Sequence, residues 1–211
     1  MRKVLLAGVF VVCGMAATAE QVVIAALGDS LTQGYGLIEQ EGFVPQMRAW
    51  LAENGADVRL INAGVSGDTT AGGASRVEWT LTPDVDGMIV ALGGNDLLRG
   101  IDPAVARANL DRILQAAEDR DVEVLLVGMQ APGNYGPDYK AAFDAIYPEL
   151  AREHGALYAE SFFEGLEVEG DPAAARDLMQ PDGIHPNAEG VSRIVAGLGP
   201  HVLDLVERAG Q

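Results

Sequence analysis

Short apolar segments alternate along this chain with segments of helical periodicity, and this alternation constrains the fold more than any other feature. Each apolar segment has the length and the β-branched composition of a strand that is buried on both faces. Strands that alternate with helices form a parallel sheet with right-handed crossovers and helices on both faces. We therefore expect an α/β fold with a central parallel five-stranded sheet, whose strands span residues 22–27, 58–63, 87–92, 122–129 and 156–163.

Helical patterns fill the connections between these strands, at residues 43–53, 71–81, 103–120, 138–154 and 187–208. Asp102 precedes Pro103 as an N-cap precedes a proline in the first turn, and Gly155 stands where helices commonly end. Two glycines and a proline between residues 197 and 200 predict a break in the last helix. The most apolar strand, at residues 122–129, is expected at the centre of the sheet.

The sequence GDSLTQGYG, residues 28–36, directly follows the first strand. Ligands of open α/β sheets bind beyond the carboxyl ends of the strands, so the Ser30 hydroxyl is placed to face a substrate. A serine before a helix is also a common N-cap, and this alternative stays open for the motif alone. Glycine-rich loops also follow the second and third strands, at residues 64–70 and 93–96.

A serine nucleophile needs a base that takes its proton, and histidine is the usual base near neutral pH. Of the three histidines, His154 is expected to cap a helix and His201 lies at the expected helix break. His185 lies in a loop flanked by glycine and proline, with Asp182 three residues earlier. Asp182 can accept a hydrogen bond from one ring nitrogen and leave the other free for Ser30. The alternative is that Asp182 and the following glycine form an ordinary turn.

Attack on an ester places negative charge on the carbonyl oxygen, which prearranged hydrogen-bond donors stabilise. The candidates for this oxyanion hole are the backbone N–H groups of Ser30 and Gly67 and the side-chain amide of Asn95, although glycine and asparagine are also common turn residues. Further candidates for contact with a substrate flank these groups or lie in the turn-rich loop at residues 131–137, a candidate wall or lid: Asp29, Asn134, Tyr135 and Ile184.

Four blocks, GDSLTQGYG, NAGVSGDTT, LGGND and DGIHP, resemble in this order those of the SGNH or GDSL hydrolases. The run MQAPGNYGPDY is similar to one in the exported thioesterase I, lysophospholipase and arylesterase group of that family. The resemblance implies a three-layer α/β/α fold like that of flavodoxin, and no metal or organic cofactor. By position it implies that Ser30 is the nucleophile, that Gly67 and Asn95 donate to the oxyanion with the Ser30 amide, and that Asp182 orients His185 as the base.

The N-terminus has the three parts of a secretory signal. Arg2 and Lys3 precede an apolar stretch, and Ala17-Thr18-Ala19 supplies a small-residue cleavage site. The stretch is shorter than the roughly 20 apolar residues that a membrane span needs. We expect residues 1–19 to be removed as a signal peptide and residues 20–211 to form a single SGNH hydrolase domain, periplasmic or secreted, without an integral membrane segment. An uncleaved anchor is the alternative.

The formal charge of −17 at pH 7 argues against nucleic acid as a partner and against docking on an anionic membrane. The one cysteine, Cys13, lies within the N-terminal stretch, so we expect the mature chain to hold no disulfide and no thiolate nucleophile. The sequence gives no sign of an obligate protein partner.

These features predict a serine esterase of the arylesterase, acyl thioesterase or lysophospholipase type. It would hydrolyse short- to medium-chain acyl esters, aryl esters, thioesters or lysophospholipids through an acyl-Ser30 intermediate. Three alternatives remain: a carbohydrate O-deacetylase with the same catalytic groups, a noncatalytic exported binding protein, and a metal-dependent hydrolase whose ligands would be Asp29, Asp68, Asp96 and His185.

Overall fold

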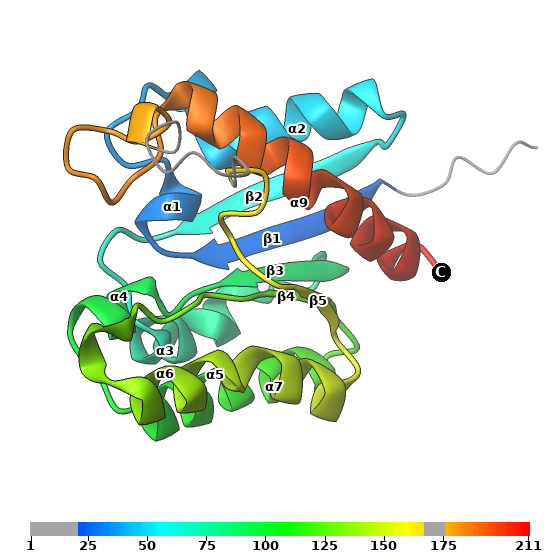
Figure 1. Ribbon diagram of the computed structural model, residues 1–211. Helices are drawn as coiled ribbons and strands as arrows, with labels where there is room; N and C mark the ends of the chain where they lie inside the picture. The colour runs from blue at the N-terminus through cyan, green and yellow to red at the C-terminus, as the bar shows by residue number, and fades with distance from the viewer. Residues whose placement is uncertain (1–20, 167–175) are drawn as a thin grey trace, which may run out of the picture.

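A five-stranded parallel sheet forms the centre of the molecule, which confirms the predicted fold class (Figure 1). The computed structural model describes residues 21–166 and 176–211, so the predicted signal peptide lies outside the described residues. The strand order is β2-β1-β3-β4-β5, and each strand pairs in parallel with its neighbours. The strands are β1 (Val22–Gly28), β2 (Val58–Gly64), β3 (Gly87–Ala91), β4 (Glu123–Val127) and β5 (Leu157–Ala159).

Helices cover both faces of the sheet and complete the three-layer arrangement (Figure 1). One face carries α2 (Phe43–Glu53) and α9 (Ala188–Ala209), which pack against each other. The other face carries α3 (Thr70–Thr80), α5 (Pro103–Glu118), α6 (Pro137–Asp144) and α7 (Ile146–His154). No helix in the described part of the chain is both long and apolar enough to cross a membrane.

Four short helical segments that lie wholly within the described residues escaped prediction because they are too short to show helical periodicity. Two are single α-helical turns, α1 (Ser30–Gln33) and α4 (Gly94–Leu98), and two are 3-10 turns, η1 (Glu39–Glu41) and η2 (Gly133–Tyr135). Both α1 and α4 directly follow strands, so they shape the loops beyond the carboxyl edge of the sheet.

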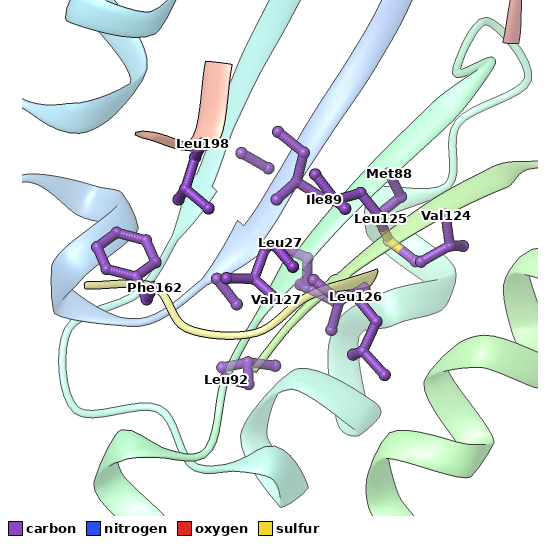
Figure 2. Packing of buried hydrophobic residues seen from close by; sticks show 14 of the residues in the cluster. Leu27, Met88, Ile89, Leu92, Val124, Leu125, Leu126, Val127, Phe162 and Leu198 are labelled. Atoms are coloured by element: carbon purple, nitrogen blue, oxygen red, sulfur yellow. The ribbon is translucent and has the colours of Figure 1, made fainter. Parts of the chain in front are cut away.

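Apolar side chains of the inner strands pack against both helical layers (Figure 2). Leu27 of β1, Ile89 of β3 and Leu125 of β4 are almost inaccessible to solvent, and Leu198 of α9 joins the same cluster. Burying one such side chain contributes about 1.5–3 kcal/mol relative to leaving it exposed. This core makes the sheet a rigid support for the loops at its edge.

The strand at the centre is β3, whereas the sequence led us to expect the strand at residues 122–129 there. That segment forms β4, which lies next to β3. Every residue of β3 is buried, as are most residues of β4. Hydropathy could not predict which of these strands lies at the centre, because helices cover both faces of every inner strand and each is therefore apolar.

Both β4 and β5 are shorter than predicted, and beyond the end of β4 the two segments stay joined through Gly128. The Gly128 N–H donates to the Ala159 carbonyl at 2.8 Å, and its carbonyl accepts from the Phe162 N–H at 2.9 Å. A Cβ atom at Gly128 would lie 2.3 Å from the Glu160 carbonyl oxygen, so this close approach of the two backbone segments requires glycine. Phe162 then enters the core, where it is 1% exposed.

The predicted helix at residues 138–154 is two helices, α6 and α7. Pro148 is the physical reason for the division. It lacks the N–H that would donate to the Asp144 carbonyl, and in a continuous helix its ring would clash with that carbonyl. Accordingly α6 ends at Asp144 and α7 begins at Ile146, with Pro148 in its first turn, where an N–H would have no helical partner.

The predicted break in the last helix is wrong, because α9 continues from Ala188 to Ala209 with Pro200 inside it. The glycines serve close packing instead. A Cβ atom at Gly199 would lie 2.7 Å from ring carbons of Trp50. The helix also buries a continuous apolar face, which outweighs the backbone hydrogen bond that proline removes. That face consists of Val191, Ile194, Val195, Leu198, Val202 and Leu205.

Candidate active site

Three loops beyond the carboxyl ends of β1, β2 and β3 meet at one end of the sheet, and a fourth folds back onto them. The first two strands lead into α1 and into the loop at residues 65–69, and β3 leads into α4 (Figure 1). The fourth loop, residues 181–186, precedes α9. Ser30, Gly67, Asn95 and His185, one residue from each loop, line the same cavity.

Ser30 is the first residue of α1 and is 9% exposed. The N-cap of α1 is Asp29, whose Oδ1 accepts from the Leu31 N–H at 3.0 Å, so the alternative that Ser30 caps the helix does not hold. The turn before Ser30 is tight. A Cβ atom at Gly28 would lie 2.0 Å from Thr32 Oγ1, so only glycine fits there.

His185 bridges Ser30 and Asp182. Its Nε2 lies 2.9 Å from Ser30 Oγ, and its Nδ1 lies 2.7 Å from Asp182 Oδ2. The Tyr35 ring packs beside the imidazole, with 4.7 Å between the ring centroids. In this geometry Nδ1–H can donate to the carboxylate while Nε2 accepts from the hydroxyl of Ser30.

The Asp182 carboxylate is held by the backbone of its own loop. Its Oδ1 accepts from the backbone N–H of Ile184 at 2.9 Å and of His185 at 3.0 Å. Hydrogen bonds from the His185 backbone, the His185 ring and the Ile184 backbone lower the pKa of Asp182 to about 2. Asp182 is therefore a carboxylate at every pH where a neutral imidazole can act as a base.

Gln180, which the sequence analysis missed, connects the His185 loop to the turn that follows Ser30. Its side-chain amide donates to the Tyr35 carbonyl at 2.8 Å and to the Pro186 carbonyl at 3.0 Å. Its backbone N–H donates to the His185 carbonyl at 2.7 Å. These three bonds fix the base relative to the nucleophile turn.

Asn95 lies in the first turn of α4, which Gly93 caps and Gly94 begins. Its Nδ2 donates to Asp29 Oδ2 at 3.1 Å, which leaves the second hydrogen of the amide for another acceptor. Asp29 is 2% exposed, and this burial raises the pKa of its carboxyl group, although hydrogen bonds from Leu31 and Asn95 act in the opposite direction. Asp29 thus orients the amide that the sequence predicts as an oxyanion donor.

The loop after β2 is held from two sides. Gly67 has φ 83°, a left-handed conformation that favours glycine, and its carbonyl accepts from Arg99 Nη2 at 2.7 Å. The next residue, Asp68, pairs with Arg76 at 2.7 Å. Further on, Thr70 donates from its backbone and hydroxyl to the fully buried Asp96, at 2.8 and 2.6 Å. The last pair joins the start of α3 to α4.

A cavity of about 490 Å³ opens beside Ser30 and His185. All four residues that the sequence predicts as substrate contacts line it: Asp29, Asn134, Tyr135 and Ile184. The side chain of Asp29, however, is engaged with Leu31 and Asn95. The sequence analysis named the loop that holds Pro132 as a candidate wall, but it missed the other apolar lining residues. These carry no chemical signal and come from four separate segments: Leu31, Tyr35, Leu97, Leu98, Met129 and Phe163.

The other two histidines are engaged away from the cavity. His154 lies 2.9 Å from Asp111 and 3.3 Å from Glu118, and His201 lies 3.2 Å from Glu164. Residues 21–166 and 176–211 contain no group of three acidic, histidine or cysteine side chains that could hold a metal ion. The carboxylates of the metal alternative instead have separate partners, described above for Asp29, Asp68 and Asp96.

Residues 26–193 match the GDSL-like Lipase/Acylhydrolase family, and the chain belongs to this family. It is 35% identical to esterase TesA of Pseudomonas aeruginosa, over 98% of this chain and all of that protein. It is also 35% identical to thioesterase 1/protease 1/lysophospholipase L1 of Escherichia coli K12, over 90% of this chain and 87% of that protein. Among solved structures, the esterase AlinE4 of the SGNH-hydrolase family shares 44% identity with a TM-score of 0.71, over 89% of this chain and 98% of that one.

Proposed function

We propose that this protein is a serine esterase that hydrolyses acyl esters and thioesters through an acyl-enzyme intermediate on Ser30. The observation that carries the proposal is the series of contacts from Ser30 Oγ to His185 Nε2 and from His185 Nδ1 to Asp182, at 2.9 and 2.7 Å, at the wall of an apolar cavity. The family and the relatives named above support the same activity.

In the acylation step, His185 Nε2 takes the proton of Ser30 as Oγ attacks the carbonyl carbon of the substrate. The Asp182 carboxylate stabilises the imidazolium that forms. The tetrahedral intermediate then collapses, and the proton on Nε2 passes to the leaving alcohol or thiol. In deacylation, His185 takes a proton from water, the resulting hydroxide attacks the acyl group, and the proton returns to Ser30.

The oxyanion of both intermediates is stabilised by the backbone N–H groups of Ser30 and Gly67 and by the Asn95 amide. The free hydrogen of that amide supports this assignment, because Asp29 occupies the other one. Losing one such donor typically costs about 3 kcal/mol of transition-state stabilisation.

The substrate class follows from the shape and lining of the cavity. About 490 Å³ bounded by leucine, methionine and aromatic side chains suits an acyl chain of short to medium length better than an acetyl group on a sugar. Aryl esters, thioesters and lysophospholipids share this requirement for an apolar acyl pocket. We therefore prefer these substrates over the carbohydrate O-deacetylase alternative.

We further propose that residues 1–19 are a signal peptide and that residues 20–211 form one catalytic domain, periplasmic or secreted. The basic start, the apolar stretch and the Ala17-Thr18-Ala19 site support export. Export would bring the enzyme to ester and lipid substrates outside the cytoplasm, where acyl thioesters of coenzyme A are scarce.

The test is hydrolysis of p-nitrophenyl acetate, butyrate, hexanoate and octanoate by the purified protein and by Ser30→Ala and His185→Ala. We expect the wild type to turn over these esters, with butyrate or hexanoate preferred to acetate, and both variants to lose several orders of magnitude in kcat. His154→Ala is the matched control, since it removes a histidine that is far from the cavity, and it should keep full activity.

Four results would contradict parts of this proposal. A folded wild type without activity on any ester would favour a binding protein. Full activity of Ser30→Ala would refute the nucleophile, and loss of activity on chelation would favour the metal alternative. A preference for acetate would favour the deacetylase.

A further inference from the structure

Arg76 of α3 does not line the cavity but contacts the ends of two strands. Its Nη2 donates to the Gly28 carbonyl at 2.9 Å, and its Nη1 donates to the Ala63 carbonyl at 2.7 Å. Its Nε donates to Asp68 Oδ2 at 2.7 Å. One guanidinium therefore joins the end of β1, the end of β2 and the loop that follows β2, and its side chain is 22% exposed.

These three contacts lie at or near the point where the pairing of β1 with β2 ends. Gly28 and Gly64 are the last paired residues of β1 and β2. Beyond that pair, a bond from the Val65 N–H to the Gly28 carbonyl, 3.0 Å long, still joins the two segments. Gly28 is two residues before Ser30, and Asp68 directly follows Gly67. Arg76 therefore binds the chain within two residues of each proposed backbone donor.

We propose that Arg76 is a positioning residue for the oxyanion hole. By binding the Gly28 carbonyl and the Asp68 carboxylate together, it fixes the distance between the Ser30 and Gly67 N–H groups. This inference rests on the proposed function, in which both groups bind the oxyanion. Arg76 acts through the backbone and does not touch the substrate, because it is not among the residues that line the cavity.

Lysine is the informative replacement at this position. An ammonium group keeps the positive charge, but it lacks the planar fork that directs separate N–H groups at three acceptors. Arg76→Lys therefore retains the charge near Asp68 while releasing at least one of the two strand ends. Donors that are displaced from the oxyanion position lose transition-state stabilisation, whereas substrate binding in the apolar cavity is preserved.

Arg48 provides the matched control. Its Nε donates to the Leu60 carbonyl at 2.8 Å, so it also binds a backbone carbonyl of β2 with a guanidinium group. Leu60 lies in the middle of β2, and neither it nor Arg48 lines the cavity. Arg48→Lys thus measures what the loss of a structural arginine does to stability without a displaced oxyanion donor.

The experiment compares the wild type, Arg76→Lys and Arg48→Lys by steady-state hydrolysis of p-nitrophenyl butyrate and by amide hydrogen exchange of the peptide spanning residues 64–70. For Arg76→Lys we expect kcat to fall roughly 10- to 100-fold with KM within about twofold of wild type, since displaced donors cost less than the 10²–10³-fold of a deleted one. The acid limb of the pH profile should not move, because the contacts of His185 are intact. Exchange in the 64–70 peptide should accelerate in this variant, and Arg48→Lys should leave both kcat and that exchange unchanged.

Unchanged exchange at residues 64–70 in Arg76→Lys overturns the inference, as does a kcat no lower than that of Arg48→Lys at equal folded fraction. The proposed function fails differently, through a folded wild type that hydrolyses no ester. In that event the exchange rates still decide whether Arg76 holds the loop.

Discussion

Asp29 is a buried residue in the wall of the cavity, and each of its carboxylate oxygens has a different partner. One oxygen accepts from the Leu31 N–H and caps α1, and the other accepts from the Asn95 amide. Burial raises the pKa of Asp29 above its unperturbed value of 3.8, so the ionised form is less favourable in the folded protein than in the unfolded chain. This residue therefore connects the site to the pH dependence of stability.

We predict that Asp29→Asn changes both the pH dependence of stability and the rate of catalysis, for separate reasons. Because the pKa of Asp29 is raised in the folded protein, the free energy of unfolding of the wild type falls as the pH rises above 3.8, for example from pH 4 to pH 7, whereas asparagine has no such charge. The stability of the variant relative to wild type should thus improve with pH. Its kcat should fall by roughly 10²-fold, because an asparagine amide cannot accept from both partners and Asn95 loses its orientation.

Urea titrations at both pH values and steady-state kinetics at pH 7 measure the two quantities. A stability difference that is independent of pH would contradict the role of burial. An unchanged kcat would contradict the role of Asp29 in orienting Asn95.

The sequence could predict the chemical groups of the candidate site better than the residues that hold them. Ser30, Asp182 and His185 occur in motifs with recognisable chemistry, and their roles stay predictions. Arg76 and Gln180 act on backbone carbonyls, which any part of the chain can supply. No spacing in the sequence marks them, because their partners are brought near by the tertiary fold.

Among the elements, α9 shows how packing overrides a local signal. Gly197, Gly199 and Pro200 together predict a break, but the two glycines admit neighbouring groups, and the helix continues. The predicted strands and the longer helices occur within a few residues of their expected places, since hydrophobic periodicity reports burial directly. Pro148 could have predicted the division between α6 and α7, but the helical periodicity of residues 138–154 favoured a single helix.

We predict that Pro200→Ala stabilises the protein. Pro200 is exposed within α9, and alanine restores an N–H that can donate to the Ala196 carbonyl. The gain in helix propensity is about 3 kcal/mol, and the greater freedom of the unfolded chain offsets up to about 1 kcal/mol, which leaves about 2 kcal/mol. Urea denaturation should show this increase, with kcat unchanged. A lower free energy of unfolding would mean that Pro200 is part of the packing of α9.

At the scale of the whole molecule, the formal charge of −17 on 211 residues dominates the electrostatics. Like charges repel one another in the compact state, and salt screens this repulsion as the Debye length falls from about 30 Å at 0.01 M to about 10 Å at 0.1 M. The ion pairs among the described residues are mostly exposed at the surface, where each contributes little.

We predict that Tm rises by about 2–4 °C between 0.01 M and 0.1 M NaCl, equivalent to about 1 kcal/mol for a chain of this size. Differential scanning calorimetry at pH 7 measures the shift, and KCl in place of NaCl controls for specific sodium binding. A Tm that falls with added salt would show that attraction within ion pairs outweighs the general repulsion.

Ser30 and His185, which are in contact, lie 155 residues apart in the sequence. The ribosome makes the proposed nucleophile early and its base late, so a growing chain carries Ser30 without a partner for most of its synthesis. Until the loop that holds His185 has been made and has folded back onto the sheet, Ser30 lacks its proposed base. In the proposed mechanism, the chain therefore gains its activity only after residues 181–186 have been made and have folded back onto the sheet.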